Sequence, residues 1–199
     1  MRCFGDGDPL YERYHDEEWG RPLPPGEDAE RALFERVSLE AFQSGLSWLV
    51  VLRKREAFRA AFAGFDPAAV AAFTDDDVER LLADPGIIRN RSKIVATIGN
   101  ARALLALHAD GQTLAGLLAA HAPPPRERPP ADASEVPSTT PASRALAADL
   151  RAAGFRFVGP TTAYATMQAV GVVNDHVAAC DQAATAADVV LVDASDSRG

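Results

Sequence analysis

A carboxylate occupies an unexpected position within residues 39–48, which read LEAFQSGLSW. The pattern predicts a helix over residues 30–42 that ends at Gly45, because apolar side chains recur at helical spacing and glycine favours a helix C-terminus. At about 100° per residue, Glu40 falls inside the apolar stripe that should face the core. Burying a carboxylate is costly unless it is paired. Glu40 is therefore a candidate binding or catalytic acid.

Trp48 begins the next predicted helix, close to Glu40 in the chain. At a helix junction, the acid can accept a hydrogen bond from a flat ring while the indole stacks on that ring, as a nucleobase pocket requires. The alternative is a core glutamate bonded to a backbone amide or an arginine, beside an ordinary core tryptophan. The stretch alone leaves both interpretations open.

Both cysteines and half of the histidines lie near the two ends of the chain, at spacings that suit a metal site. Cys3 and His15 are separated by 11 residues and His176 and Cys180 by 3, so the second pair can share one face of a helical turn. Two thiolates and two imidazoles form a preferred tetrahedral zinc set without an open position for water, so the ion would be structural. Unpaired cysteines beside surface or core histidines are the alternative.

Residues 75–107 have the layout of a helix-hairpin-helix: a helix, a tight turn at Gly86, two apolar residues and a second helix. Acidic side chains precede the turn, and the basic side chains that follow it include Arg89, Arg91 and Lys93. Backbone amides at the turn and at the second helix's N-terminus, reinforced by these cations, would suit a DNA phosphate. An ordinary helical hairpin with a solvated basic face is the alternative.

The helical patterns indicate an all-α protein with one domain over residues 1–180. Residues 1–27 look irregular, because Gly, Asp and Pro interrupt them. Residues 122–142 contain 7 of the 14 prolines and are predicted to be an extended linker. Residues 181–199 are predicted to be a disordered tail, and residues 189–192 within it are the one strand-like stretch.

Composition limits the class of protein. With 199 residues and 47% hydrophobic content, the chain can bury a sizeable core. No apolar run approaches the roughly 20 residues of a membrane helix, and no signal peptide is recognisable, so we expect a soluble cytoplasmic protein. The net charge of -8 argues against indiscriminate nucleic-acid binding but allows a localised basic patch.

Taken together, several motifs resemble the 3-methyladenine DNA glycosylase I family. They read DPLYERYHDEEWG, LEAFQSGLSW followed by VLRKRE, GIIRNRSKI, FRFVGPTTAYATMQAVG and VNDHVAAC. They span nearly all of the chain from Cys3 to Cys180, and the NDHVxxC ending is specific. The resemblance implies an all-α helix-hairpin-helix glycosylase with one structural zinc ion, which excises 3-methyladenine from alkylated double-stranded DNA.

The resemblance also implies roles for individual side chains. Glu40 would contact the flipped base, and Trp48 would stack on it. Tyr14 and Trp19 would complete the pocket. Leu46 is the apolar residue best placed to fill the space that the base leaves.

The chemistry of that substrate agrees with the residues. A base methylated at N3 is cationic and leaves readily once a dry pocket holds it, and Glu40 can accept a hydrogen bond from its exocyclic amine. Ala41 and Phe42 depart from the family pattern, and we expect Phe42 to point into the core. No lysine is placed for Schiff-base chemistry, so we expect a monofunctional enzyme that leaves an abasic site and works as a monomer without a protein partner.

Two other functions compete with this interpretation. A non-catalytic, zinc-containing helix-hairpin-helix DNA-binding protein would use the same hairpin and metal, but it would not need Glu40 among aromatic residues. A zinc hydrolase would need an open coordination position, which a set of four protein ligands does not leave.

Overall fold

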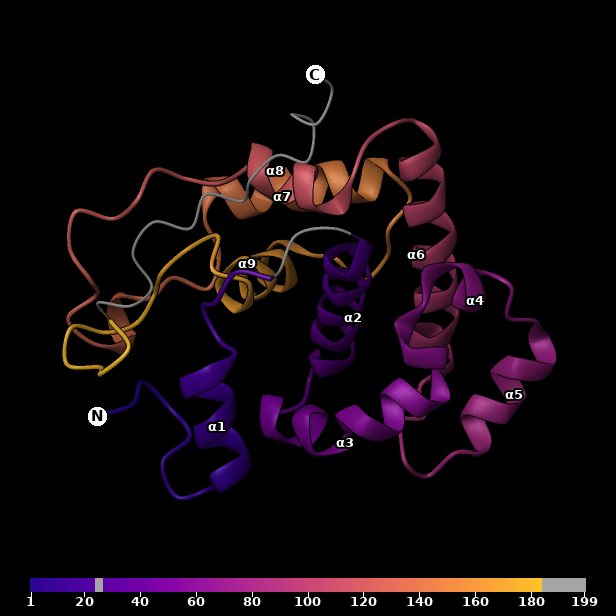
Figure 1. The fold of residues 1–199 in the computed structure, drawn as a ribbon, viewed down its shortest axis with the longest axis horizontal. Coiled ribbons are helices and arrows are strands. Elements are labelled where there is room, and N and C mark those ends of the chain that lie inside the picture. The colour runs from indigo at the N-terminus through magenta and orange to yellow at the C-terminus, as the bar shows by residue number, and fades with distance from the viewer. Residues whose placement is uncertain (24–26, 184–199) are drawn as a thin grey trace.

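The computed structural model describes residues 1–23 and 27–183, and these residues form helices and connecting segments without a strand (Figure 1). The all-α prediction is confirmed for this part of the chain. Residues 184–199, which hold most of the predicted tail and its strand-like stretch, lie outside the described residues. The elements are α1 (Pro9–Glu17), α2 (Glu27–Gln43), α3 (Trp48–Ala61), η1 (Ala63–Phe65), α4 (Pro67–Ala71), α5 (Asp75–Ala83), α6 (Arg91–Ala109), α7 (Leu114–Ala120), η2 (Ala133–Glu135), α8 (Pro141–Ala152) and α9 (Pro160–Ala169).

Helix α2 lies at the centre of the fold and packs against α3, α6, α7 and α9 (Figure 1). Residues 36–42 are all buried, so the second half of this helix is enclosed by the core on every side. The buried apolar side chains of the helix are Ala29, Leu33, Phe34, Val37, Leu39, Ala41 and Phe42. Any polar side chain in residues 36–42 is therefore carried inside the molecule, and Glu40 is such a residue.

Helix α1 corrects the prediction that residues 1–27 are irregular. Asp8 caps this helix, because its Oδ1 accepts hydrogen bonds from the amides of Leu10 and Tyr11 at 3.0 and 3.2 Å, and Pro9 occupies the first helical position. The same Asp-Pro pair precedes α4, so the sequence did contain a signal for a helix that starts at Pro9. The helix carries His15 and the aromatic residues beside it into the interior.

The proline-rich residues 122–142 contain only the short η2 before α8 begins at Pro141, and parts of this segment pack on the rest of the protein. Pro130 is buried, and its carbonyl accepts a hydrogen bond from the amide of Ala178 at 2.8 Å. Ala133 and Val136 line a pocket that the next subsection describes. Proline favours this role, because it presents a fixed extended backbone with no amide of its own to satisfy.

Helices α5 and α6 flank a tight turn at Gly86, as the sequence predicted. The turn lies against α3, where a Cβ on Gly86 would come within 3.0 Å of the Ala57 side chain, so only glycine fits without displacement. Asp84 Oδ1 accepts a hydrogen bond from the Gly86 amide at 2.7 Å. Asn90 then caps α6, since its Oδ1 accepts from the Lys93 amide at 3.1 Å.

Among the described residues, no single helix is long and apolar enough to cross a membrane. One bent pair, α6 and α7 at 82°, has the length and composition only when its two helices are counted together.

Candidate functional site

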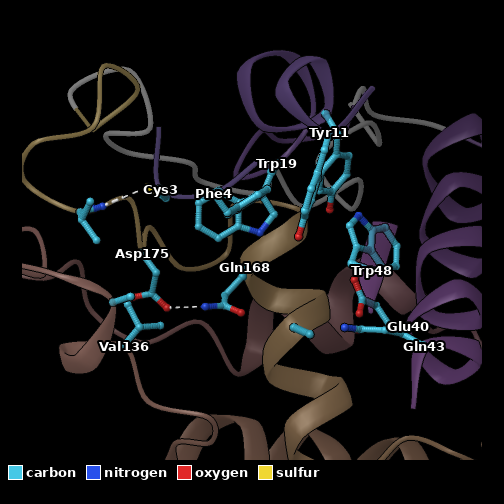
Figure 2. A pocket seen from close by; sticks show the side chains of 14 residues that line it. Cys3, Phe4, Tyr11, Trp19, Glu40, Gln43, Trp48, Val136, Gln168 and Asp175 are labelled. Atoms are coloured by element: carbon cyan, nitrogen blue, oxygen red, sulfur yellow. Dashed lines mark hydrogen bonds between the residues drawn. The ribbon is translucent and has the colours of Figure 1, made fainter. Parts of the chain in front are cut away.

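A pocket of about 340 Å³ opens between α1, the C-terminal half of α2 and α9 (Figure 2). This volume suits a small flat molecule, because ligand pockets typically measure about 300–1,000 Å³. Aromatic side chains form much of its wall: Phe4, Tyr11, Tyr14, Trp19 and Trp48. The pocket thus brings together Tyr14, Trp19, Trp48 and Glu40, the four residues that the sequence assigned to one site.

Glu40 is a buried acid that lines this pocket (Figure 2). It is 5% exposed, and its carboxylate has no hydrogen-bond partner among the described residues. Burial raises the pKa of Glu40 to about 7, although the nearby Arg36 cation partly offsets this effect. The alternative of a core glutamate bonded to an amide or an arginine is not observed in the described chain. An unpaired buried acid beside a cavity is available to a ligand.

Arg36 forms a support behind the aromatic wall that the sequence analysis did not anticipate. Its Nη1 donates a hydrogen bond to the Tyr14 hydroxyl at 3.0 Å, and its guanidinium lies 5.2 Å from the Tyr14 ring centre and 5.6 Å from that of Trp48. Glu18 partly balances the charge, with a carboxylate oxygen 3.7 Å from Arg36. Because burial raises the pKa of Tyr14, the hydroxyl keeps its proton and remains a donor.

The sequence analysis did not assign several pocket residues, among them Phe4, Tyr11 and Gln168. Phe4 packs on Tyr11 and Trp19 with ring centres 4.9 and 5.0 Å apart. Tyr11 lies three residues before Tyr14, and an α1 prediction from Asp8-Pro9 would have placed both tyrosines on one face. Gln168 lacks such a signal, because it follows a stripe of core residues in α9.

Gln168 has a fixed orientation in the wall. Its Nε2 donates a hydrogen bond to Asp175 Oδ2 at 2.9 Å, which leaves the amide oxygen facing the pocket (Figure 2). Asp175 is itself held by the Tyr164 hydroxyl at 2.5 Å and by Arg126 at 2.8 Å. The pocket therefore offers a second acceptor besides Glu40.

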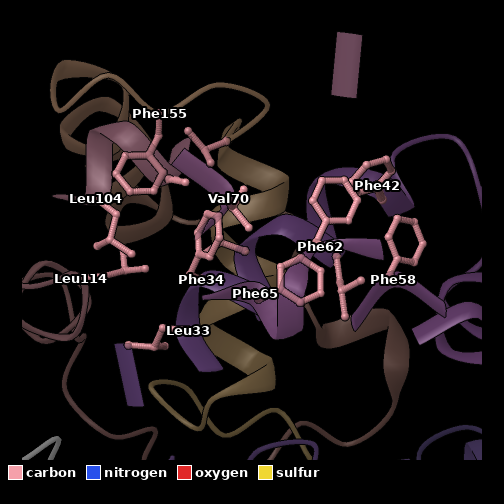
Figure 3. Packing of buried hydrophobic residues seen from close by; sticks show 14 of the residues in the cluster. Leu33, Phe34, Phe42, Phe58, Phe62, Phe65, Val70, Leu104, Leu114 and Phe155 are labelled. Atoms are coloured by element: carbon pink, nitrogen blue, oxygen red, sulfur yellow. The ribbon is translucent and has the colours of Figure 1, made fainter. Parts of the chain in front are cut away.

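Phe42 lies in the core, as predicted. It is fully buried, with its ring centre 4.6 Å from that of Phe58 and 6.0 Å from that of Phe62 (Figure 3). It does not line the pocket. The large Phe42 side chain thus packs among other core phenylalanines and does not reduce the volume of the pocket.

Leu46 lies outside the pocket, at the turn between α2 and α3. Its side chain is 43% exposed, which is unusual for leucine. Gly45 precedes it with φ of 84°, a left-handed conformation that glycine adopts without strain. The turn therefore presents an apolar side chain to solvent.

The basic residues after Gly86 differ in what they contact. Arg89 is exposed and has no ion-pair partner among the described residues, whereas Arg91 Nη2 lies 2.6 Å from Glu79. Lys93 corrects the expected phosphate contact, because it is 7% exposed and its ammonium donates to the carbonyls of Phe42 and Ser44 at 2.9 and 2.8 Å. An ammonium satisfied inside the protein is not free for a phosphate.

The other basic cluster is also engaged. Arg53 donates to Asp8 at 2.5 Å, and Arg55 forms an ion pair with Glu18. Lys54 donates to the carbonyls of Pro85 and Gly86. The cluster therefore makes contacts within the protein, and the Arg53 side chain is at the same time 60% exposed.

Cys3, His15, His176 and Cys180 form a cluster at the back of the pocket, and their ligand atoms all lie within 4.8 Å of one another. Cys3 Sγ lies 3.5 Å from His176 Nδ1, and Cys180 Sγ lies 3.4 Å from both His15 Nε2 and His176 Nδ1. A tetrahedral ion with metal–sulfur bonds of about 2.3 Å and metal–nitrogen bonds of about 2.0 Å separates such atoms by about 3.5 Å. The four residues therefore fit a tetrahedral metal ion.

Surrounding groups affect whether the cluster can bind a cation. His15 Nδ1 lies 2.8 Å from Asp16 Oδ1, so a carboxylate orients this imidazole with Nε2 toward the cysteines. Burial lowers the pKa of His176 to about 4, which keeps it neutral and able to ligate. Burial also raises the pKa of the Cys3 thiol, so its thiolate form needs a nearby positive charge.

The metal-ligating cluster and the pocket share a wall. Cys3 lines the pocket, the Trp19 ring lies 4.5 Å from that of His176, and the Phe4 ring lies 5.0 Å from that of His15. An ion that orders the histidines would therefore also order two aromatic side chains of the pocket.

Comparison with known proteins agrees with this arrangement. The sequence model of a family described as methyladenine glycosylase matches residues 4–183. DNA-3-methyladenine glycosylase 1 of Escherichia coli (strain K12) is 49% identical over 174 residues, which cover 87% of this chain and 91% of that protein. The chain belongs to the methyladenine glycosylase family.

Solved structures of 3-methyladenine DNA glycosylase I share the fold. One crystal structure matches with a TM-score of 0.86 at 48% identity and covers 91% of this chain and 98% of that one. A structure of the Staphylococcus aureus enzyme, described as the structural basis of 3-methyladenine recognition, matches with a TM-score of 0.83 at 33% identity and covers 90% of this chain and 94% of that one. The predicted resemblance to this glycosylase family is thus confirmed.

Proposed function

We propose that this methyladenine glycosylase family member hydrolyses the N-glycosidic bond of 3-methyladenine in alkylated double-stranded DNA, releasing the base and leaving an abasic site. The observation that carries the proposal is Glu40, a buried acid in an aromatic pocket of nucleobase size that has no hydrogen-bond partner in the part of the chain that the structure describes. The curated relative and the solved structures described above bear the name of this activity.

Glu40 acts by matching the charge of the damaged base. Adenine methylated at N3 is cationic, so its bond to the sugar is weak. When this bond breaks, the base keeps the bonding electrons and leaves as a neutral molecule. A carboxylate in a dry pocket attracts this cation and accepts a hydrogen bond from its exocyclic amine. The cation in turn favours the ionised form of Glu40. Unmodified adenine lacks the positive charge and leaves less readily.

The aromatic wall holds the extruded base. Trp48 stacks on one face, and Tyr14, whose hydroxyl is a donor supported by Arg36, sets one edge. Trp19 closes the wall beside the metal-ligating cluster. Close packing around the base excludes bulk water and strengthens its attraction to Glu40.

Leu46 and the α5–α6 unit contact the DNA outside the pocket. Leu46 fills the space in the duplex that the flipped base vacates, since it is apolar, exposed and carried on a turn. The unit acts as a helix-hairpin-helix, in which the turn at Gly86, the N-terminus of α6, Arg89 and Arg91 contact phosphate oxygens.

The enzyme is monofunctional. A lyase step needs a free amine at the sugar, and Lys54 and Lys93, the two lysines of the chain, both donate to backbone carbonyls. Each ammonium is thus held within the protein.

Zn²⁺ is the ion that suits the metal-ligating cluster, because two thiolates and two imidazoles at tetrahedral spacing form a closed, structural set. It would tie the first residues of the chain to Cys180 and stabilise the pocket wall. We expect about one zinc per monomeric chain by elemental analysis. The Cys180→Ser variant should lose the metal and melt at a lower temperature, because metal binding is coupled to folding.

The decisive experiment is release of free base from methylated duplex DNA. The wild-type protein should release 3-methyladenine and leave strands that break only after alkali treatment. Binding of the same DNA without base release would favour the non-catalytic zinc-containing DNA-binding protein. Hydrolysis that depends on an exchangeable water at the metal would favour a zinc hydrolase, which the closed ligand set opposes.

A further inference from the structure

The two lysines of the chain make the same type of contact, in which one ammonium donates to two backbone carbonyls. The ammonium of Lys93 in α6 donates to the carbonyls of Phe42 and Ser44 at the C-terminus of α2. The ammonium of Lys54 in α3 donates to the carbonyls of Pro85 and Gly86, at 2.9 and 3.0 Å. Neither lysine forms an ion pair with a described carboxylate. The chain has 20 basic residues in all, so arginine fills every other basic position.

These contacts connect two turns crosswise. Lys93 follows the Gly86 turn in the chain and holds the backbone just before Leu46. Lys54 follows the Leu46 turn and holds the backbone of the Gly86 turn. Each turn is thus fixed by the lysine that comes after the other turn.

We propose that Lys93 and Lys54 are positioning residues that fix Leu46 and the Gly86 turn relative to each other. The inserted Leu46 and the phosphates bound at the Gly86 turn then lie at a fixed spacing along the duplex. This inference rests on the proposed function. Leu46 is 43% exposed and has little packing of its own to hold it, so its position depends on its backbone. A glycosylase that flips a base must place the inserted side chain opposite the phosphates that it grips.

An ammonium suits these sites for a physical reason. Phe42 lies in the last turn of α2, where carbonyls lack intrahelical partners and carry the negative end of the helix dipole. A compact ammonium with three donors can bind two converging carbonyls at each site. Gly86 adds a second connection, because its closeness to Ala57 seats the turn directly on α3.

A double-mutant cycle between Lys93→Met and Leu46→Ala tests the proposal by single-turnover release of 3-methyladenine from duplex DNA. Lys93→Met should slow release roughly tenfold in the wild-type background, the loss expected for a charge-assisted hydrogen bond. In the Leu46→Ala background it should change the rate by less than about twofold, because the residue that it positions is gone. Affinity for free 3-methyladenine base should stay within about twofold of wild type, since the pocket is intact.

A spectroscopic signal reports Leu46 directly. Duplex DNA with a tetrahydrofuran abasic site opposite 2-aminopurine should change its fluorescence when wild-type protein inserts Leu46. Lys93→Met should reduce this change, and Leu46→Ala should abolish it.

Arg102→Met is the matched control. Arg102 also lies in α6 and donates to two carbonyls, those of Ala71 and Phe73, at 2.9 and 3.0 Å. These carbonyls are far along the chain from Leu46. The variant should retain the fluorescence change and show rate effects that are additive with Leu46→Ala.

Each of the following outcomes would overturn either the proposal or the proposed function on which it rests. Additive effects of Lys93→Met and Leu46→Ala would show that Lys93 does not act through Leu46. If Lys93→Met instead reduces the slope of log K against log salt by about one unit and leaves the fluorescence change intact, Lys93 contacts a phosphate directly. No base release by the wild-type protein would overturn the proposed function, whereas the fluorescence assay would still test the connection between the turns. If Lys93→Met melts below the assay temperature, Lys54→Met enters the same cycle, and additivity there would likewise overturn the proposal.

Discussion

Glu40 and Lys93 are two buried charges in one molecule, and they differ in what surrounds them. Lys93 is 7% exposed and has two carbonyl acceptors, so its charge is satisfied by the fold. Glu40 is 5% exposed, lines a cavity and has no hydrogen-bond partner in the described chain. A buried charge is costly unless it is compensated, so the uncompensated one is where a ligand has most to contribute.

The largest expected effect is on catalysis at Glu40. Glu40→Gln should slow single-turnover release of 3-methyladenine roughly ten- to a hundredfold, because a charge-assisted hydrogen bond worth about 1.5–3 kcal/mol is lost. Glu30→Gln is the matched control on the same helix. Glu30 accepts from the amides of Leu114 and Ala115 at 2.8 Å, so this variant should lose stability but not rate. Near-wild-type release by Glu40→Gln would reduce Glu40 to a structural acid.

The pH dependence of excision should be the next largest effect. Burial raises the pKa of Glu40 to about 7, and the ionised form is the one that attracts a cationic base. Release of 3-methyladenine at subsaturating enzyme should therefore rise about tenfold per pH unit below about pH 7 and level off above it. The profile of Glu40→Gln should be flat over the same range. A wild-type profile without this inflection would place the essential charge elsewhere.

Stability should change in opposite directions for the two buried charges. Lys93→Met should lower the free energy of unfolding by about 1–3 kcal/mol, because two backbone carbonyls, that of Phe42 buried, lose their donor. Glu40→Gln should raise it at neutral pH. Because the pKa of Glu40 is raised in the folded protein, this side chain contributes to the free energy of unfolding. The contribution is complete below pH 4.5, the ordinary pKa of a glutamate, and is lost as the pH rises through about 7. The gain from Glu40→Gln should therefore grow over that interval in urea titrations. Equal destabilisation by both variants would contradict the contrast between them.

The smallest effect is expected on the DNA-contacting surface. Arg89→Gln should weaken binding to duplex DNA of any sequence and reduce the slope of log K against log salt by about one unit. Arg102→Gln provides the comparison, because its guanidinium is already bound to backbone carbonyls. Fluorescence anisotropy over a range of salt concentrations measures both slopes. Identical slopes for Arg89→Gln and wild type would place the phosphate contacts elsewhere.

The metal-ligating cluster and the buried acid could be predicted from the sequence because rare residue types mark them. Cys and His with a short spacing restrict the geometry strongly, and a carboxylate in an apolar stripe is conspicuous. Lys93 was misassigned because a run of cations along the chain does not reveal which side chain points inward. The pocket roles of Gln168 and of the proline-rich wall near Val136 depend on contacts between distant segments, and no local pattern contains that information.

The pairing of Arg53 and Arg55 has a consequence for how an enzyme of the proposed function would search DNA. Both guanidinium groups already contact carboxylates, and the chain as a whole is acidic. We therefore expect few counterions to be released at an undamaged site, so that dwell times there are short and sampling of successive sites is fast. Prolonged residence would require a base that enters the pocket. The kinetic delay that commits the protein to a lesion would thus arise in the pocket, after the DNA backbone has been bound.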